Sequence, residues 1–138
     1  MTCKFLKEEI LGKYTIPSRE LYEVVVEYLL VIASDSDIQK KFIGGGSMMM
    51  IELGVDMIAD LYTEELMERK ELTEEVGASI LKIMDEVSNK YFDKKQYDET
   101  VWVENALHAH PFWEEKRKEA LSILKALNEP YREPTYSL

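Results

Sequence analysis

One carboxylate and two imidazoles lie close together in the chain, at Glu104, His108 and His110. Glu104 and His108 are four residues apart, so on a helix their side chains leave the same face. Such a pair can share a metal ion, because both groups are common metal ligands. The chain has no third histidine, however, whereas a dinuclear carboxylate site needs Glu-x-x-His on two helices and glutamates from two more. We therefore expect no metal or other cofactor, and favour a surface ion pair or a helix-capping histidine here.

Glu27 has the most unusual sequence context of any carboxylate, since it interrupts the most apolar run of the chain, residues 24–33. A carboxylate buried there would have a raised pKa or find a partner, and a small enzyme could use it as an acid or base. Its spacing from Glu20 and Glu23 indicates instead one polar edge of a helix. We expect Glu27 to lie exposed on that edge. No arrangement of Ser, Cys and His indicates a catalytic nucleophile.

Five of the seven methionines fall within residues 48–67, on a predicted helix that is apolar around most of its circumference. Carboxylates four residues apart form one acidic stripe along it, at Glu52, Asp56, Asp60 and Glu64. A central core helix with one solvated edge would show this pattern. The alternative is a surface for a partner chain, because methionine is flexible and adapts to what it binds. On that alternative we expect the contacts to come from Met49, Met50, Leu53 and Met57.

The last ten residues, 129–138, form a tail in which a Glu-Pro unit occurs twice, followed by Tyr131 and Tyr136. Proline keeps the tail out of a helix. An extended Pro-Tyr segment can dock on its own domain or on a neighbour, so both tyrosines are further interface candidates. A disordered tail is the alternative.

Hydrophobic spacing and capping residues predict an all-α fold, a single bundle-like domain of five or six helices over residues 1–128. Ser18 and Thr73 are expected to cap helices over residues 19–33 and 74–92, and Pro111 suits the first turn of the last helix. The β-branched residues within 24–32 could instead form a strand, but the length of the run favours a helix. Glycines 44–46 indicate a flexible break, because the lysine of a phosphate-binding loop is missing. The remaining helices are expected at residues 2–11, 48–70 and 99–109, with one or two turns at 38–43. In the helix over residues 74–92 we expect a buried stripe of Val76, Ile80, Ile83, Met84 and Val87. In the last helix we expect Trp113, Ala120, Leu121, Leu124 and Leu127 to point inward.

The composition argues against some classes of function. The 138 residues carry a net charge of −10, which argues against direct binding of nucleic acid. We expect a cytoplasmic protein without a membrane-spanning segment, since there is one cysteine, no signal peptide and no long apolar run. The chain has 33 Glu and Lys against five Asn and Gln, a bias typical of proteins from hot environments.

These observations favour a small non-enzymatic interaction module or accessory subunit. We expect it to form a homo-oligomer, with a dimer favoured, or to bind a protein partner. One alternative is a ligand- or metal-binding bundle with its site near Glu104, His108 and His110. The other is a small enzyme that uses a buried carboxylate.

Overall fold

The computed structural model describes residues 16–42, 56–92, 108 and 110–135. Within these ranges the chain forms five helices and no strand: α2 (Ser18–Ala33), α3 (Ser36–Phe42), α5 (Asp56–Glu68), α6 (Glu74–Phe92) and α8 (Pro111–Ala126). The predicted all-helical fold is confirmed for this part of the chain, and the β-branched run in α2 is helical. The predicted helix over residues 2–11, the glycine break and most of the predicted helix over residues 99–109 lie outside the described ranges.

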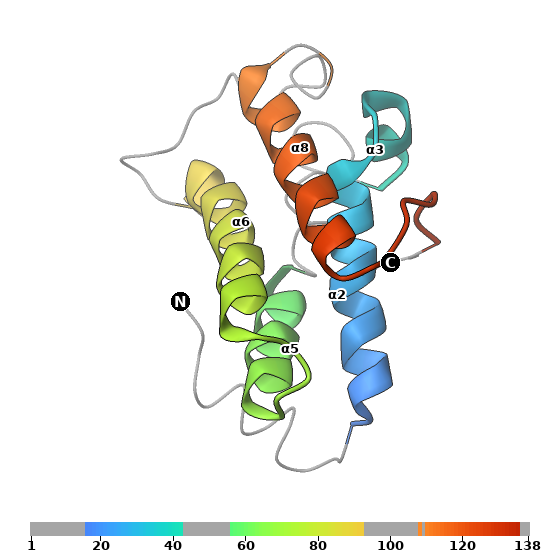
Figure 1. The fold of residues 1–138 in the computed structure, drawn as a ribbon. Helices are drawn as coiled ribbons and strands as arrows, with labels where there is room; N and C mark the ends of the chain where they lie inside the picture. The colour runs from blue at the N-terminus through green and yellow to red at the C-terminus, as the bar shows by residue number, and fades with distance from the viewer. Residues whose placement is uncertain (1–15, 43–55, 93–107, 109, 136–138) are drawn as a thin grey trace.

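Four of the helices enclose one core. α2 packs against α5 and α8, and α6 packs against the same two helices, so the four close a ring (Figure 1). α3 follows α2 after a short bend and packs back on its end. None of the helices in the described ranges is long and apolar enough to cross a membrane.

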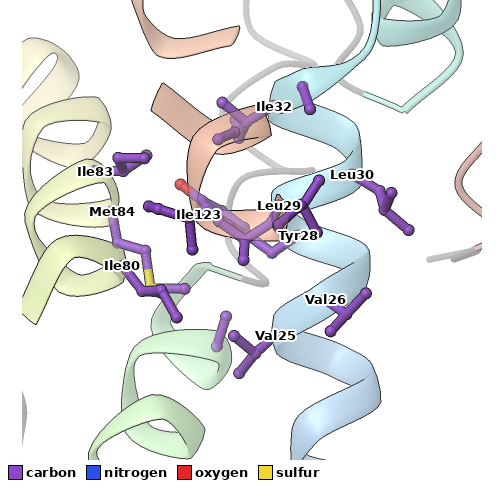
Figure 2. Packing of buried hydrophobic residues seen from close by; sticks show 14 of the residues in the cluster. Val25, Val26, Tyr28, Leu29, Leu30, Ile32, Ile80, Ile83, Met84 and Ile123 are labelled. Atoms are coloured by element: carbon purple, nitrogen blue, oxygen red, sulfur yellow. The ribbon is translucent and has the colours of Figure 1, made fainter. Parts of the chain in front are cut away.

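The core is built from the apolar faces of these helices. Figure 2 shows Leu29 of α2 and Ile123 of α8 directed toward Ile80, Ile83 and Met84 of α6, all of them buried. Val87 is buried too and Val76 is half-buried, so the predicted inward stripe of α6 is confirmed. At the other end of α8, Trp113 is fully buried and meets the ring of Phe112 edge-on, with 5.2 Å between the ring centroids.

The described part of the Met-rich helix belongs to this core. Ala59, Leu61 and Leu66 of α5 are buried. α5 also lies so close to α6 that a Cβ atom on Gly77 would be 2.4 Å from the sulfur of Met67. A side chain at position 77 would therefore require the flexible Met67 side chain to move.

The start of α2 differs from the prediction. Pro17, with extended backbone, occupies the capping position, and Ser18 is the first helical residue with no capping bond from its side chain. The Ser18 hydroxyl instead accepts a hydrogen bond from Arg69 Nη1 (3.1 Å), which also donates to the carbonyl of Ile16 (2.7 Å). The arginine at the end of α5 thus engages the serine that the sequence offers as a cap.

The other end of α2 is closed by a residue of α3. Gln39 is fully buried, and its Nε2 donates to the carbonyl oxygens of Val31 (3.2 Å) and Ile32 (3.0 Å). Arg117 of α8 in turn donates to Gln39 Oε1 (3.2 Å). Carbonyls in the last turn of a helix have no partner within the helix, so this amide supplies one and joins three helices.

The remaining helix ends follow simple local rules. Thr73 caps α6 as predicted, with its Oγ1 accepting from the backbone N–H of Val76 (3.2 Å), and Pro111 opens α8. α5 ends with Lys70 in the left-handed conformation (φ 64°), and backbone bonds run from Lys70 to Met67 and from Glu71 to Leu66. This is a Schellman motif, which terminates the helix and satisfies its last carbonyls.

One prediction for α8 is wrong. Leu121 does not point inward, because the buried face of the helix is formed by Trp113, Lys116, Ala120, Ile123 and Leu124. Leu121 is one residue beyond Ala120 and therefore about 100° around the helix from it. Lys116 and Ile123, which the predicted inward set lacks, belong to the buried face instead.

Candidate functional site

Residues 129–135, called here the C-terminal segment, lie against α2 beyond the end of α8 (Figure 1). Asn128 adopts the left-handed conformation (φ 60°), and backbone bonds run from Asn128 to Lys125 (3.0 Å) and from Glu129 to Leu124 (2.9 Å). This second Schellman motif ends α8 and turns the chain back along the bundle. Beyond it, Pro130 and Pro134 prevent further helix. The segment is therefore docked on its own domain, which is one of the two outcomes expected for it.

Glu27 holds the far end of the segment. Its Oε1 lies 2.8 Å from Arg132 Nη2 and accepts from the hydroxyl of Thr135 (3.0 Å), while Oε2 accepts from the backbone N–H of Thr135 (3.0 Å). Glu27 is only 7% exposed, so the prediction that it lies on an open edge is wrong. Glu20 and Glu23 of the same helix are exposed as expected. The difference arises because the C-terminal segment covers the Glu27 level of the helix. The apolar run around Glu27 indicates that it needs a partner but not which segment supplies one.

The contacts of Glu27 set its charge. Burial alone would raise its pKa, but the hydrogen bonds from Arg132 and Thr135 outweigh burial, and the pKa lies below its ordinary value. The group is consequently a stable carboxylate at neutral pH. A general acid needs a raised pKa, and a carboxylate with a lowered pKa is a weak base. Glu27 is therefore suited to anchoring the segment rather than to proton transfer.

Two further bonds hold the segment on both sides of this anchor. Tyr22 Oη donates to Glu129 Oε1 (2.8 Å), and burial together with this carboxylate raises the pKa of Tyr22. The hydroxyl of Ser34 donates to the carbonyl of Leu30 (2.6 Å) and lies 2.9 Å from Tyr131 Oη. Because the Ser34 proton is directed to Leu30, Tyr131 is the donor in that contact.

The side chains that hold the segment share one face of α2. By helical spacing, Tyr22, Glu27 and Ser34 surround Val26 and Leu30. Figure 2 shows Val26 and Leu30 pointing away from α6, yet both are buried. Pro134 of the segment is buried as well. The segment therefore docks on an apolar face of α2 with polar contacts around it.

Beside the segment lies an open hollow of about 370 Å³, lined by Leu121, Leu124, Lys125, Asn128, Glu129, Pro130 and Tyr131. Leu121 and Tyr131 are each 43% exposed, and they are the large hydrophobic residues that remain exposed in the described part of the chain. Tyr131, one of the predicted interface residues, thus lies at an apolar surface. Tyr136 lies outside the described residues.

The histidines have local partners. His110 precedes α8, and its Nδ1 accepts from the backbone N–H of Phe112 (3.0 Å), so it is a capping histidine of the kind expected. His108 is exposed, with Nδ1 3.2 Å from Ser36 Oγ. Glu104 lies outside the described residues. Within the described ranges, no three His, Cys, Asp or Glu side chains are grouped as metal ligands would be.

A second buried charge, which sequence reasoning missed, lies between α6 and α8. Lys116 is 1% exposed, and its Nζ is 2.9 Å from Glu86 Oε2, 2.8 Å from Glu119 Oε2 and 5.5 Å from the centre of the Phe112 ring. Burial would lower the pKa of Lys116, but the two carboxylates raise it above its ordinary value. Glu119 could be paired with Lys116 from helical spacing alone, whereas Glu86 could not.

Most of the interface candidates on the Met-rich helix lie outside the described residues. These are Met49, Met50 and Leu53, and of Met57 only the backbone, within α5, is described.

No family model matches the chain, and no curated protein or solved structure is found to resemble it.

Proposed function

We propose that the chain is a small non-enzymatic interaction module that associates with a second copy of itself through the hollow between α8 and the C-terminal segment. The observation that carries this proposal is that Leu121 and Tyr131, two exposed large apolar residues, both line one hollow. Scattered apolar residues on a surface need no explanation, but apolar residues gathered in a hollow with a polar rim favour a binding surface.

The charges of the hollow favour a second copy as the occupant. Its lining includes one positive side chain, Lys125, and one negative side chain, Glu129. In a two-fold contact the same patch faces itself, so Lys125 of each copy can approach Glu129 of the other while the apolar residues meet between them. The net charge of −10 opposes association at long range, but physiological salt screens it beyond about 8 Å.

Other surfaces and activities have less support. The Met-rich helix over residues 48–67 remains the alternative interface, although the described apolar residues of α5 are used in the chain's own core. Of the three residues predicted for a metal or ligand site, the structure describes His108 and His110, and the Nδ1 of His110 is engaged in capping. For an enzyme, the oxygens of Glu27 are both engaged by the C-terminal segment.

Sedimentation velocity of matched variants at micromolar concentration tests the proposal. Leu121→Asp places a charge in the hollow, and Ser122→Asp places the same charge on the next residue, which is exposed and does not line the hollow. We expect the wild type and Ser122→Asp to sediment as dimers and Leu121→Asp as a folded monomer. A wild-type monomer, or a dimer that survives Leu121→Asp and is lost in Met49→Glu, would contradict the proposed interface.

A further inference from the structure

We infer that the two copies associate by exchanging their C-terminal segments, so that residues 129–135 of each copy dock on α2 of the other, with Arg132 and Thr135 at the partner copy's Glu27. This inference rests on the proposed self-association and adds how it occurs. In the structure the site is occupied by the segment of the same chain. An identical segment on a second copy is complementary to the site by construction, and exchange of such an element is a low-cost route to a dimer.

The contacts of the segment can be made by a segment of either copy. Glu27 receives a guanidinium, a hydroxyl and a backbone N–H, and the last two come from the same residue, Thr135. Each of these bonds is to α2, so none depends on where the rest of the donor chain lies. Release of the segment removes these bonds from Glu27, and only a segment with the same donors in the same order restores them all.

The segment is held by few residues. Of its seven residues, Pro134 is the buried one, and Pro130, Tyr131, Arg132, Glu133 and Thr135 are exposed. Detachment therefore exposes little of the segment's own apolar surface. In the exchanged dimer the bonds from the segment to α2 are formed again, while the two backbone bonds that close the turn at Asn128 are lost. The additional contacts between the copies must outweigh that loss.

Exchange requires a hinge between α8 and the C-terminal segment, and the turn at Asn128 lies there. The segment is folded back on its own α2 by the turn at Asn128, which two backbone hydrogen bonds close. A change of backbone angles at Asn128 and Glu129 redirects everything beyond them while α8 stays intact. A few residues at the end of an element commonly absorb such changes.

The size of the hollow also favours exchange. Stable interfaces bury about 800 Å² per partner and involve about 20–30 residues on each side. Seven residues line the hollow, fewer than a stable interface commonly uses on each side. Two exchanged segments add their contacts with α2 to the same interface, because residues 129–131 belong both to the segment and to the hollow.

Charge reversal in full-length chains tests exchange directly. In Glu27→Arg the site repels Arg132, and in Arg132→Glu the segment is repelled by Glu27. We expect each variant alone to be a monomer. A 1:1 mixture should form a heterodimer, because each exchanged segment then docks on a site of opposite charge. Native mass spectrometry detects this heterodimer. The control carries both substitutions in one chain, which restores the charge pair without the acceptors for Thr135, so it should associate more than either single variant and less than the wild type.

The outcomes separate this inference from the proposed function. If the wild type dimerises and each single variant dimerises equally well, the hollow is the interface and exchange is wrong. If the two variants pair with each other in the mixture no more often than random pairing predicts, exchange is also wrong. If the wild type is a monomer and no heterodimer forms in the mixture, both proposals fail.

A second measurement avoids substitution of the buried Glu27. Arg132 is exposed, so the full-length Arg132→Glu chain should remain folded with its own segment detached. A labelled peptide of residues 128–138 is then titrated into it and followed by fluorescence anisotropy. We expect this peptide to bind about tenfold or more tightly than the same peptide carrying Arg132→Glu, because hydrogen bonds to a charged group are lost in the latter. Equal affinities of the two peptides would overturn the inference.

Discussion

Two charged side chains are buried in the part of the chain that the structure describes, and they are held in opposite ways. Lys116 lies inside the ring of helices, paired with Glu119 of its own helix and Glu86 of α6. Glu27 lies on an outward face of α2, paired with Arg132 and Thr135 of a short segment without secondary structure. Both carboxylates around Lys116 belong to helices of the ring, so the packing of α6 against α8 keeps them close to it. The partners of Glu27 can leave while all five described helices stay in place.

This difference distinguishes a fixed contact from an exchangeable one. Each site satisfies a buried charge with hydrogen bonds, as burial requires. At Lys116 the ion pair is part of the packing between α6 and α8, so its loss should weaken the whole domain. At Glu27 the loss should release one segment and little else. The predictions below test this contrast from the largest expected effect to the smaller ones, and a last one compares the two helix ends at Lys70 and Asn128.

Replacing Lys116 by methionine should lower the free energy of unfolding on the order of 3 kcal/mol, because Glu86 and Glu119 then face each other without their shared cation. Lys118→Met is the matched control. Lys118 is exposed and 3.6 Å from Glu114, so its loss should change stability by less than about 0.5 kcal/mol. Urea unfolding followed by circular dichroism measures both. Equal effects of the two substitutions would show that the Lys116 cluster is not a structural centre.

Glu27→Ala should lower the free energy of unfolding by a smaller amount, about 1–2 kcal/mol, because only the bonds of the segment are lost. The unfolding transition should remain a single cooperative one. Glu23→Ala, one turn earlier on the same helix and exposed, removes a surface ion pair with Arg19 and should have little effect. A loss at Glu27 as large as that at Lys116 would mean that the segment is integral to the core.

The two sites should respond to opposite ends of the pH scale. The pKa of Glu27 is lowered on folding, so its stabilisation is present above the ordinary value of 4.5 and is lost as the pH falls below it. The pKa of Lys116 is raised, so its stabilisation is present below 10.5 and is lost as the pH rises above it. The free energies of unfolding of the wild type and Glu27→Gln should therefore become equal in acid. Those of the wild type and Lys116→Met should become equal in base. Convergence at the same end would contradict the assignment.

The smallest effect concerns the two left-handed residues that end helices. Lys70→Gly should stabilise the protein by about 0.5–1 kcal/mol, because glycine adopts this backbone without the steric cost of a Cβ atom. Asn128→Gly should gain less, since asparagine tolerates the left-handed region better than lysine does. Thermal unfolding of the two variants gives the comparison. A loss of stability in Lys70→Gly would contradict the strain assigned to that position.

Local rules predicted most of the described fold. Thr73 as a cap, Pro111 at the start of a helix and the inward stripe of α6 follow from residue type and spacing within a few positions. The errors come from contacts between distant positions. The Ser18 hydroxyl is engaged by Arg69 from another helix, and Lys116 can be buried only because Glu86 approaches from α6. Neither partner is visible in the local sequence.

The site was predicted in part. The proline and tyrosine content of the tail indicated an extended segment that could dock, and Tyr131 was a candidate for that reason. The docking partner was not predictable, because Glu27 and Thr135 are 108 positions apart and the pattern of Glu20, Glu23 and Glu27 indicates a solvated edge. A carboxylate within the most apolar run was the one sequence signal that pointed to a buried partner.

Hydrogen exchange of the Thr135 amide most directly tests whether the segment detaches while the bundle stays folded. This N–H donates to Glu27 Oε2, whereas the amide of Leu127 donates to carbonyls at the end of α8 and that of Leu29 lies within α2. Measured by NMR in low concentrations of urea, the Thr135 amide should exchange through a local opening whose free energy is well below that of global unfolding and independent of urea. The Leu29 amide should exchange only with global unfolding. Equal protection of Thr135 and Leu29, with the same dependence on urea, would contradict the account of a detachable C-terminal segment.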